Sequence, residues 1–387
     1  MKPTLSIIIY SLASGGAERV VSLLLPRLQE HYHVTLILMN STIHYDIPQH
    51  THIFYLDRSL PYESGILKLI KLPYLAWKYQ RAFQNTDITL AFMNRPSYIA
   101  ILARLLGQRG KIIISERAMP SMQYAYPGLQ SWINKKLIRW LYPKADLIIA
   151  NSYGNTNDLL QNFVPNAKIT TIHNPIDIQM VETLAQEPVE DVVFDNTYTF
   201  ITVGRLDAGK NHSLIIESFY RLNLPLSQLL IIGDGPLRAN LQEQIKRLKL
   251  EHQVHLIGKK KNPFAYLAKS NCFVFGSNHE GFPNVILEAL ACELPIISTD
   301  CQSGPREILA PTLPVNSRSI QQIMHTEYGI LVPLNNPEYM SGAMIDIYHD
   351  QALSNKLKRN AKMRSQDFNK DTILTHYIKA IDDITTN

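Results

Sequence analysis

The side chains best suited to chemistry in this sequence are two glutamates with seven residues between them, Glu280 and Glu288. They lie in the stretch EGFPNVILE, where the apolar spacing predicts a helix over residues 284–291 that begins directly after a loop. Backbone N–H groups at a helix start attract an anion, and Asn284 and Val285 are placed to supply them. Glu288, about one turn further, is then near enough to hold the diol of a ribose. Two ordinary glutamates on a helix face would give the same spacing.

A pair of cations follows the first predicted strand of the second half of the chain. The segment GRLDAGKN places Arg205 and Lys210 directly after a predicted strand over residues 198–204. A forked guanidinium and a compact ammonium together suit a diphosphate, and they can neutralise it as it leaves. No Asp pair at D-x-D spacing occurs in the sequence, so we expect no bound metal and no cofactor. A surface loop that merely contains Arg and Lys is the alternative interpretation.

Glycines end several other predicted strands. Gly233 and Gly235 follow one strand, and Gly258, with Lys259 beside it, follows the next. Glycine lets the backbone approach a ligand closely, although a plain tight turn gives the same pattern.

A further glycine turn, Gly15-Gly16, lies between the first predicted strand and the first predicted helix, three residues before Arg19. It matches neither the GxGxxG fingerprint nor a P-loop, which disfavours a dinucleotide-binding dehydrogenase. The start of the helix still attracts phosphate.

The elements that must position these residues are short apolar runs that alternate with helical patterns. This alternation indicates βαβ units and a parallel sheet in each half. The predicted fold class is therefore α/β, with two Rossmann-like domains. The predicted strands cover residues 5–12, 33–39, 88–92, 111–115 and 145–150 in the first half, and 198–204, 228–233, 254–258, 272–276 and 295–298 in the second.

The domain boundary is predicted after the chain breaker Asn174-Pro175. We expect an N-terminal domain over residues 1–175 and a C-terminal domain over residues 190–370, and 387 residues suffice for two such cores. The last segment, residues 371–387, has a helical pattern and is expected to pack back on the N-terminal domain.

Charge divides unevenly between the halves. Residues 1–173 carry 18 Lys and Arg against 9 Asp and Glu, whereas the rest of the chain is net acidic. A basic first half is expected to face an anionic partner, either phosphate groups or anionic lipid. Two basic stretches rich in Trp and Tyr, residues 66–83 and 132–144, lie in this half and fit an anionic membrane surface. A solvated basic helix face is the alternative for each stretch, and no nucleic-acid recognition motif occurs, so no nucleic-acid partner is expected.

No apolar run reaches the 18 residues of a membrane span, and the run at residues 5–10 reads as a buried strand. The chain has three cysteines with no metal-binding spacing. An odd number of cysteines disfavours a disulfide framework and fits a reducing, cytoplasmic setting.

Taken in order, these motifs resemble those of the retaining GT-B glycosyltransferases of family 4. The hallmarks are the glycine turn after the first strand, G-R-x-x-x-x-K-N, G-x-G and E-G-[FY]-x(5)-E, and the likeness spans essentially the whole chain. Within the family, the segments IYSLASGGAERVV, MNRPSYIA, LYPKADLI, VGRLDAGKNH and NHEGFPNVILEALAC are similar to the GalNAc transferases of bacterial N-linked protein glycosylation (the pgl pathway), most of all to the one that adds the second GalNAc.

The resemblance implies two Rossmann-like domains across a cleft, with a UDP-sugar donor held mainly by the second. It further implies a metal-independent N-acetylgalactosaminyltransferase that uses UDP-GalNAc, forms an α linkage on an undecaprenyl-diphosphate-linked glycan and works at the cytoplasmic face of the inner membrane as a peripheral protein. The expected catalytic residues are Arg205, Lys210 and Glu280. The expected donor-binding residues are Gly15, Gly16, Gly204, Gly233, Gly235, Gly258, Lys259, Gly281, Phe282, Asn284, Val285 and Glu288.

The sequence departs from the family pattern at two places. Where many members have Ser-Glu-His, this chain has Ser115-Glu116-Arg117, so Glu116, Arg117 and also Arg19 are the candidates for sugar or acceptor contacts. Pro283 removes one backbone donor from the glutamate loop.

Two alternatives stay open. The first is a family 4 transferase that uses UDP-glucose, UDP-GlcNAc or GDP-mannose in lipopolysaccharide or capsule assembly. The second is a non-catalytic sugar-nucleotide-binding protein.

Overall fold

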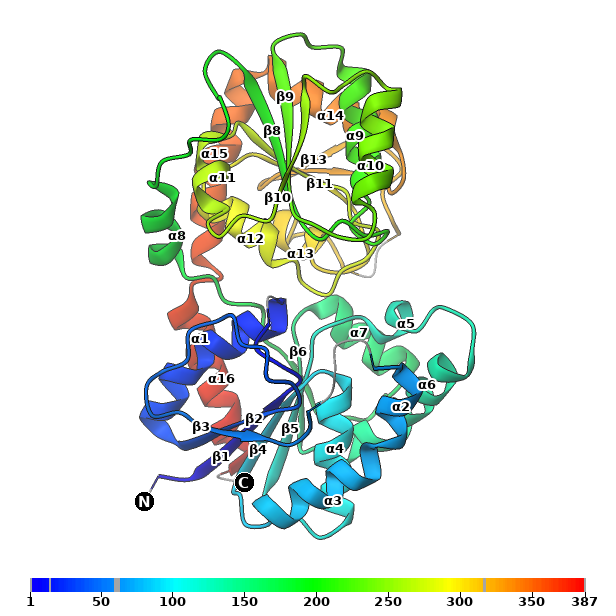
Figure 1. Ribbon diagram of the computed structural model, residues 1–387, viewed down its shortest axis with the longest axis vertical. Coiled ribbons are helices and arrows are strands. Elements are labelled where there is room, and N and C mark those ends of the chain that lie inside the picture. The colour runs from blue at the N-terminus through cyan, green and yellow to red at the C-terminus, as the bar shows by residue number, and fades with distance from the viewer. Residues whose placement is uncertain (1, 14, 59–62, 316–317, 386–387) are drawn as a thin grey trace. The chain divides into compact units, whose positions relative to one another are not determined.

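The computed structural model describes residues 2–13, 15–58, 63–315 and 318–385, and the chain divides into two compact units (Figure 1). The N-terminal unit consists of Met1–Pro175 together with Lys370–Asn387, and the C-terminal unit of Ile176–Asn369. Ser14, which precedes the first glycine turn, lies outside the described residues. The predicted α/β class with two doubly wound sheets is confirmed.

A parallel sheet forms the centre of the N-terminal unit. Among the described residues it has seven strands in the order β3-β2-β1-β4-β5-β6-β7. The strands are β1 (Thr4–Ile9), β2 (His33–Leu38), β3 (His52–Tyr55), β4 (Ile88–Phe92), β5 (Lys111–Glu116), β6 (Leu147–Ala150) and β7 (Ile169–Thr171).

Helices cover both faces of this sheet, because alternate strand side chains point to opposite faces. Ile7 and Ile9 of β1 pack with α1 (Gly16–His31) and α16 (Lys370–Thr385), whereas Ile8 packs on the other face with α3 (Leu72–Phe83), α4 (Asn94–Leu105) and α6 (Leu129–Leu141). The remaining helical segments of the unit are α2 (Gly65–Ile70), α5 (Pro120–Gln123), the 3-10 turn η1 (Tyr142–Lys144) and α7 (Tyr153–Asn162).

The C-terminal helix α16 belongs to the N-terminal unit. Tyr377 and Ile381 are fully buried in its core, and burial of such side chains contributes about 1.5–3 kcal/mol each. The hydroxyl of Tyr32, at the end of α1, donates to the Asp382 carboxylate at 2.5 Å. The last stretch of the chain is therefore part of the first domain in space.

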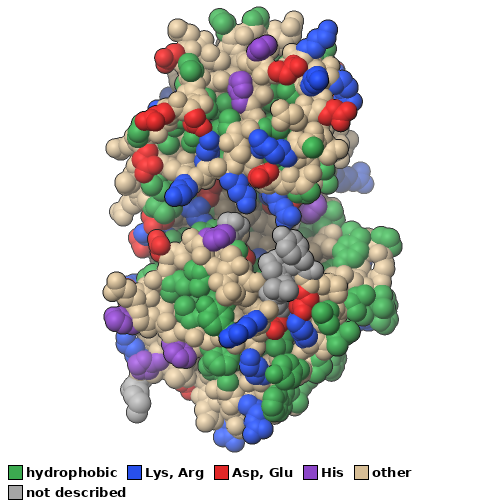
Figure 2. Space-filling model, viewed as in Figure 1, with side chains coloured by type: hydrophobic (Ala, Val, Ile, Leu, Met, Phe, Trp, Pro, Cys, Tyr) green, Lys and Arg blue, Asp and Glu red, His purple; other side chains and the backbone are tan. Residues whose placement is uncertain are grey.

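One edge of the N-terminal unit carries exposed apolar and basic side chains, and we name it the aromatic–basic face. Figure 2 shows apolar side chains gathered over this edge, which α2, α3 and α6 form in Figure 1. Cation–π contacts join its two kinds of residue, with Arg81 5.5 Å from the Trp77 ring and Lys136 5.8 Å from the Trp132 ring. The exposed members are Ile66, Leu67, Ile70, Tyr74, Trp77, Arg81, Leu129, Trp132, Lys136, Arg139 and Trp140.

The C-terminal unit repeats the architecture. Its described residues form seven strands in the order β10-β9-β8-β11-β12-β14-β13, parallel except for the last pair. The strands are β8 (Tyr198–Val203), β9 (Ser227–Ile232), β10 (Val254–Gly258), β11 (Cys272–Phe275), β12 (Ile296–Thr299), β13 (Met324–His325) and β14 (Ile330–Val332).

Its helices again form two layers. One face of the sheet packs against α9 (His212–Leu222), α10 (Arg238–Arg247) and α14 (Pro337–His349), and the other against α8 (Ile178–Ala185), α11 (Phe264–Lys269), α12 (Asn284–Ala291) and α13 (Pro305–Leu309). The long helix α15 (Gln351–Gln366) contributes Leu357 to the first core and Ala361 to the second.

Candidate active site

The carboxyl ends of β8, β9 and β10 bring three glycine turns together. Gly204 donates its N–H to the Ile232 carbonyl at 2.9 Å, and Gly233 donates to the Gly258 carbonyl at 2.9 Å. A Cβ on Gly233, where φ is +146°, would lie 1.8 Å from the Gly204 carbonyl oxygen. This position therefore requires glycine because two chain segments approach each other. The sequence predicted that these glycines let the backbone approach a ligand closely. The structure shows in addition that the loop at Gly233 lies against the loop at Gly204.

Lys210 and Glu280 form the charged pair at this edge of the sheet. The Lys210 ammonium is 2.5 Å from the Glu280 carboxylate and 5.5 Å from the centre of the Phe275 ring. The Lys210 backbone N–H donates to the Asp207 carboxylate at 3.1 Å, which fixes the loop that carries the lysine. The sequence predicted the loop with Lys210 and the loop with Glu280 as separate motifs. In the structure the two side chains, 70 residues apart in sequence, are bonded to each other.

Arg205 has a different environment. Its side chain is 72% exposed, and its Nε lies 3.8 Å from the Asp207 carboxylate. Lys259, at the end of β10, is also exposed. Both cations are therefore exposed side chains at strand ends, where an anion can reach them.

The glutamate loop leads into α12. This helix begins at Asn284 after Pro283, whose side chain does not cap the helix start. Glu288 is buried in its second turn, and Phe282 is buried against the Phe368 ring with the ring centres 5.5 Å apart. Glu288 thus lies one turn after the helix start at Asn284, with its side chain buried.

A second loop, which the sequence analysis missed, holds the glutamate loop in place. The Ser303 hydroxyl donates to the Gly281 carbonyl at 2.6 Å. Gly304 has φ +85°, and a Cβ there would lie 2.4 Å from Pro283 Cδ. The buried guanidinium of Arg306 donates from Nε to the Asp300 carboxylate at 2.9 Å and so fixes this second loop. The only sequence signal for it was the Gly304-Pro305 pair, which is typical of a helix start.

His212 lies directly behind the cation loop. It is buried at the start of α9, and burial, with a smaller contribution from the nearby Lys210 charge, lowers its pKa from 6.5 to about 4. The imidazole is therefore neutral at physiological pH and does not compete with Lys210 for an anion.

In the N-terminal unit, the first glycine turn starts α1. Gly15 precedes the helix and itself provides no side-chain cap, and its carbonyl accepts a hydrogen bond from the Tyr45 hydroxyl at 3.1 Å. A Cβ on Gly15 would lie 2.2 Å from the Glu18 carboxylate, whose pKa burial raises. Arg19 lies in the first turns of the same helix, so Gly15, Gly16 and Arg19 lie together after the carboxyl end of β1.

Glu116 is buried in a hydrogen-bond network below the sheet's carboxyl edge. Its carboxylate accepts hydrogen bonds from the Tyr142 hydroxyl at 2.7 Å, from the Asn94 amide at 3.1 Å and from the backbone N–H groups of Arg117 and Ala118. Burial raises the pKa of this carboxyl group, and these hydrogen bonds oppose the rise. The geometry supports a positioning role for Glu116, not a direct sugar contact.

Arg117 is likewise buried. Its guanidinium donates to the Tyr377 hydroxyl at 2.8 Å and to the Asn174 side chain, and it lies 5.9 Å from the Phe92 ring. Arg117, which directly follows β5, is thus hydrogen-bonded to Tyr377 of α16 and to Asn174, which lies next to the unit boundary at Pro175. In this structure its side chain bonds to protein groups.

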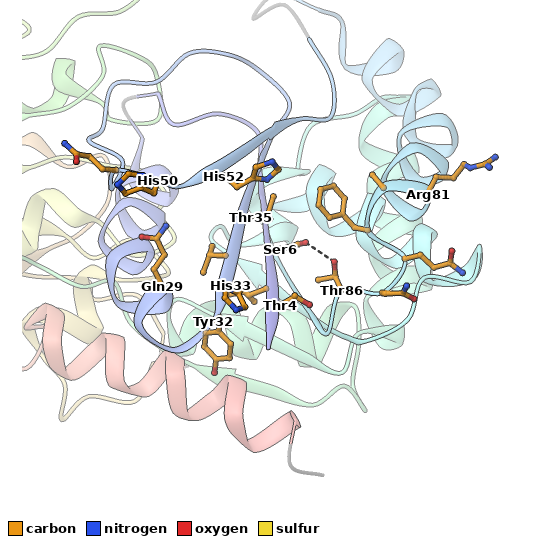
Figure 3. A pocket seen from close by; sticks show the side chains of 17 residues that line it. Thr4, Ser6, Gln29, Tyr32, His33, Thr35, His50, His52, Arg81 and Thr86 are labelled. Atoms are coloured by element: carbon orange, nitrogen blue, oxygen red, sulfur yellow. Dashed lines mark hydrogen bonds between the residues drawn. The ribbon is translucent and has the colours of Figure 1, made fainter. Parts of the chain in front are cut away.

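A groove of about 740 Å³ opens at the amino ends of the strands of the N-terminal sheet, opposite the carboxyl ends that carry the residues above. Figure 3 shows the side chains that line this groove. Thr4 and Ser6 of β1 and His33 of β2 line it, and the Ser6 and Thr86 hydroxyls lie 3.4 Å apart. The groove follows the amino ends of the strands. Ligands of open parallel sheets bind outside the carboxyl ends, so we do not assign the chemistry to this groove.

Two Rossmann-like units, each with charged and glycine loops after the carboxyl ends of its parallel strands, define the GT-B class of glycosyltransferases. Family models match both units, Glycosyltransferase Family 4 over residues 14–180 and Glycosyl transferases group 1 over residues 186–364. The chain belongs to the family 4 glycosyltransferases, and the resemblance drawn from its motifs is confirmed.

Particular relatives narrow the comparison. The chain is 42% identical to the N-acetylgalactosamine-N,N'-diacetylbacillosaminyl-diphospho-undecaprenol 4-alpha-N-acetylgalactosaminyltransferase of Campylobacter jejuni, over 97% of this chain and 98% of the relative. It is 33% identical to an uncharacterised glycosyltransferase of Methanocaldococcus jannaschii, over 80% of this chain and 82% of the relative.

Solved structures share the fold. HepE of Anabaena in complex with UDP has a TM-score of 0.79 at 18% identity, with 98% of this chain and 100% of that chain covered. Sucrose-phosphate synthase of Thermosynechococcus elongatus has a TM-score of 0.81 at 18% identity and covers 100% of both chains.

Proposed function

We propose that this glycosyltransferase moves GalNAc from UDP-GalNAc to an undecaprenyl-diphosphate-linked oligosaccharide with an α linkage. The observation that supports the use of a sugar-nucleotide donor is the Lys210–Glu280 pair, 2.5 Å apart at the carboxyl edge of the C-terminal sheet. The acceptor half is supported by the 42% identity to the C. jejuni enzyme over nearly the full length of both chains. The UDP-bound relative with the same fold supports a UDP-sugar donor.

In this proposal the donor diphosphate lies over the strand ends of the C-terminal unit. Lys210 and Arg205 neutralise the negative charge that develops on the leaving phosphate, and the start of α12, at Asn284 and Val285, adds backbone donors. Glu288 holds the ribose diol. The glycines at the strand ends (Gly204, Gly233, Gly235, Gly258) and Gly281 leave room for the nucleotide, and Lys259 and Phe282 complete the donor site of this unit. Gly15 and Gly16, in the N-terminal unit, stay proposed donor-binding residues.

Retention of configuration follows from attack on the face that the leaving group occupies. The bond from the anomeric carbon to the phosphate oxygen breaks, and the freed phosphate oxygen accepts the proton of the acceptor hydroxyl as the new bond forms. Glu280 orients Lys210 and the sugar hydroxyls and is not a nucleophile. No metal ion is required, because the two cations stabilise the leaving diphosphate.

The aromatic–basic face is proposed to rest on the anionic cytoplasmic surface of the inner membrane. Trp and Tyr side chains favour the membrane interface, and each Lys or Arg near an anionic surface contributes about 1 kcal/mol. The proposed attachment is peripheral, through the side chains of this face. No helix among the described residues is long and apolar enough to span a bilayer. This placement would bring the enzyme to a lipid-linked acceptor.

The test measures UDP release from a panel of UDP-sugars, and GDP release from GDP-mannose, with an undecaprenyl-diphosphate disaccharide as acceptor and with EDTA present. Turnover confined to UDP-GalNAc is expected. Turnover with UDP-glucose, UDP-GlcNAc or GDP-mannose instead would discard the proposed donor. No turnover with any donor in folded protein would favour the sugar-nucleotide-binding alternative, and turnover abolished by EDTA would contradict the metal-free mechanism.

A further inference from the structure

Three asparagine side chains join the loops that surround Lys210. We name Asn211, Asn278 and Asn335 the asparagine clasp. Asn211 directly follows Lys210 at the start of α9, and Asn278 lies two residues before Glu280 in the loop after β11. Asn335 lies in the loop between β14 and α14. The clasp therefore connects three loops at the carboxyl edge of the C-terminal sheet, where the charged pair lies.

Asn211 is the centre of the asparagine clasp. Its side-chain nitrogen donates to the Asn278 side-chain oxygen at 3.2 Å and to the Asn335 side-chain oxygen at 3.0 Å. An amide NH2 group has two hydrogens, and both are used here. One side chain thus links the loop after β8, which carries Lys210, to the loops after β11 and β14.

Asn278 fixes the backbone on the other side of Lys210. Its backbone N–H donates to the Gly209 carbonyl at 2.9 Å, and its side-chain nitrogen donates to the Ala208 carbonyl at 3.1 Å. Backbone carbonyls of a loop need such partners, because no helix or strand ladder supplies them. Together with the bonds of the Asn211 amide, these bonds hold the chain both before and after the lysine.

The start of α9 does not by itself explain why an asparagine stands at position 211. Asparagine is among the most favourable N-cap residues, because its side-chain oxygen accepts from backbone N–H groups of the first turn. An N-cap residue usually has an extended backbone, whereas Asn211 has φ +50° and ψ 46° and makes no such capping bond. Its amide bonds to the two neighbouring loops instead.

The third loop of the clasp is anchored on a capped helix. Only residues 333–336 separate β14 from α14, and Asn335 has φ +53°. The next residue, Asn336, accepts hydrogen bonds from the backbone N–H groups of Glu338 and Tyr339 at 3.1 Å each, which caps α14. Helix α14 packs in the same core as α9. The Asn211 side chain is therefore held by an acceptor that lies outside the two charged loops.

From these contacts we infer that the asparagine clasp positions Lys210 for the transfer step. In the structure the Lys210 ammonium bonds to Glu280, and in the proposed reaction it must reach the phosphate that leaves. Because the backbone is held on both sides of the lysine, the change of partner needs only a rotation of its side chain. Charge that is placed in advance stabilises the transition state without rearrangement of a loop.

The clasp residues are thus positioning residues that act through Lys210, and they do not touch the substrate. This inference rests on the proposed function, and its test separates the two. Glycine replaces asparagine here without backbone strain, because it adopts a positive φ readily. Asn211→Gly and Asn335→Gly therefore remove the side-chain bonds of the clasp and keep the backbone conformation.

The first measurement is steady-state transfer from UDP-GalNAc to the undecaprenyl-diphosphate disaccharide. We expect each glycine variant to lower kcat about tenfold, since an error of about 1 Å in the position of a catalytic group can cost up to 10²-fold. The donor KM should change less than about twofold, because Lys210 acts mainly on charge that develops as the phosphate leaves. Asn335→Asp keeps an acceptor oxygen for the Asn211 amide and should retain most of the wild-type kcat.

The second measurement repeats Asn211→Gly in the Lys210→Met background, with radiolabelled donor so that the residual activity is measured. If the clasp acts through Lys210, the glycine should cause no further loss of kcat once the ammonium is gone. A residue that only stabilises the fold would lower kcat by the same factor in both backgrounds. If Asn211→Gly does not fold, Asn335→Gly makes the same comparison from an exposed position.

Asn223→Gly is the matched control. Asn223 ends the same helix with nearly the same backbone conformation, φ +49° and ψ 44°, and lies about 16 Å along the helix from its start. Its kcat should equal that of the wild-type protein.

Unchanged kcat in folded Asn211→Gly and Asn335→Gly, or an equal further loss in the Lys210→Met background, would overturn the inference and leave the proposed function standing. Wild-type turnover with another sugar donor alone would overturn the proposed donor, and the same comparisons with that donor would still decide on the clasp. No wild-type turnover with any donor would overturn the proposed function and this inference with it.

Discussion

Replacing Lys210 by methionine removes the ammonium that lies 2.5 Å from the Glu280 carboxylate and keeps most of the aliphatic volume. The lysine side chain is 27% exposed and that of the glutamate 13%, so the carboxylate loses a largely desolvated partner. A hydrogen bond to a charged group contributes about 1.5–3 kcal/mol to stability. For a domain of this size that corresponds to a fall in Tm of roughly 3–10 °C.

The loss of activity should be larger than the loss of stability. By comparison with the removal of one oxyanion-hole donor, kcat should fall by about 10²–10³, or about 2.7–4 kcal/mol of transition-state stabilisation. The donor KM should change less, because the lysine acts mainly on charge that develops as the phosphate leaves.

The double variant Lys210→Met/Glu280→Gln separates the two effects. Replacement of both partners by neutral groups removes the unpaired carboxylate, so the Tm should return to within a few degrees of the wild-type value. The kcat should stay low, because neither catalytic group is restored. Thermal unfolding followed by circular dichroism and UDP release at saturating donor measure the two quantities.

Lys362→Met is the matched control. It breaks another lysine–glutamate pair of the same unit, Lys362 with Glu293 at 2.5 Å, in which both side chains are about half exposed. Such surface pairs contribute about 0–1 kcal/mol, so stability and kcat should both stay close to wild type. A Lys210→Met variant with wild-type kcat, or a double variant that regains activity, would refute the assigned role of Lys210.

Three further variants test other parts of the site and surface. Arg205→Leu should leave stability within about 0.5 kcal/mol, since the side chain is 72% exposed, and should lower kcat at least tenfold; a loss of Tm without loss of kcat would reverse the assignment. In the folded protein the buried His212 stays neutral down to about pH 4, whereas in the unfolded chain it takes up a proton below about pH 6.5. The unfolded state therefore binds more protons between these pH values, and the free energy of unfolding should fall by up to roughly 3 kcal/mol as pH drops from 6.5 to 4. His212→Gln should lack this pH dependence in urea unfolding, and equal slopes in the two proteins would contradict the buried, neutral histidine. Trp132→Ala combined with Lys135→Gln and Lys136→Gln should weaken sedimentation with anionic liposomes several-fold in low salt, and unchanged sedimentation would refute the membrane role of the aromatic–basic face.

Much of the fold could be predicted from the sequence because its central strands are continuous apolar runs. Strands β4 (Ile88–Phe92) and β10 (Val254–Gly258) have the bounds that the pattern predicted. The strands that were missed, β3, β7, β13 and β14, have two to four residues and lie at or next to a sheet edge. Their burial depends on neighbours far away in sequence, so local pattern carries little signal for them.

Helix α1 continues through Pro26, from Gly16 to His31. The Val20, Val21, Leu24 and Leu25 side chains on both sides of the turn before it are fully buried, and this packing holds the helix in register despite the missing N–H.

The charged residues of the site could be predicted, but their pairing could not. Lys210 and Glu280 each follow a strand end, and parallel strands collect their carboxyl ends at one edge, so a shared site was expected. That the two side chains bond to each other depends on β8 and β11 being neighbours in the sheet. The roles of Ser303 and of the buried Glu116 depend on hydrogen bonds between loops that have no periodicity, and spacing alone does not reveal them.

The central claim is transfer of GalNAc with retention onto a polyprenyl-diphosphate glycan. The measurement that tests it most directly is NMR of the product made from UDP-GalNAc and an undecaprenyl-diphosphate disaccharide, with the coupling constant of the new anomeric proton as the readout. The account predicts one added GalNAc signal with the small coupling of an α linkage. A large coupling, which marks a β linkage, or an added sugar other than GalNAc when donors compete, would contradict it.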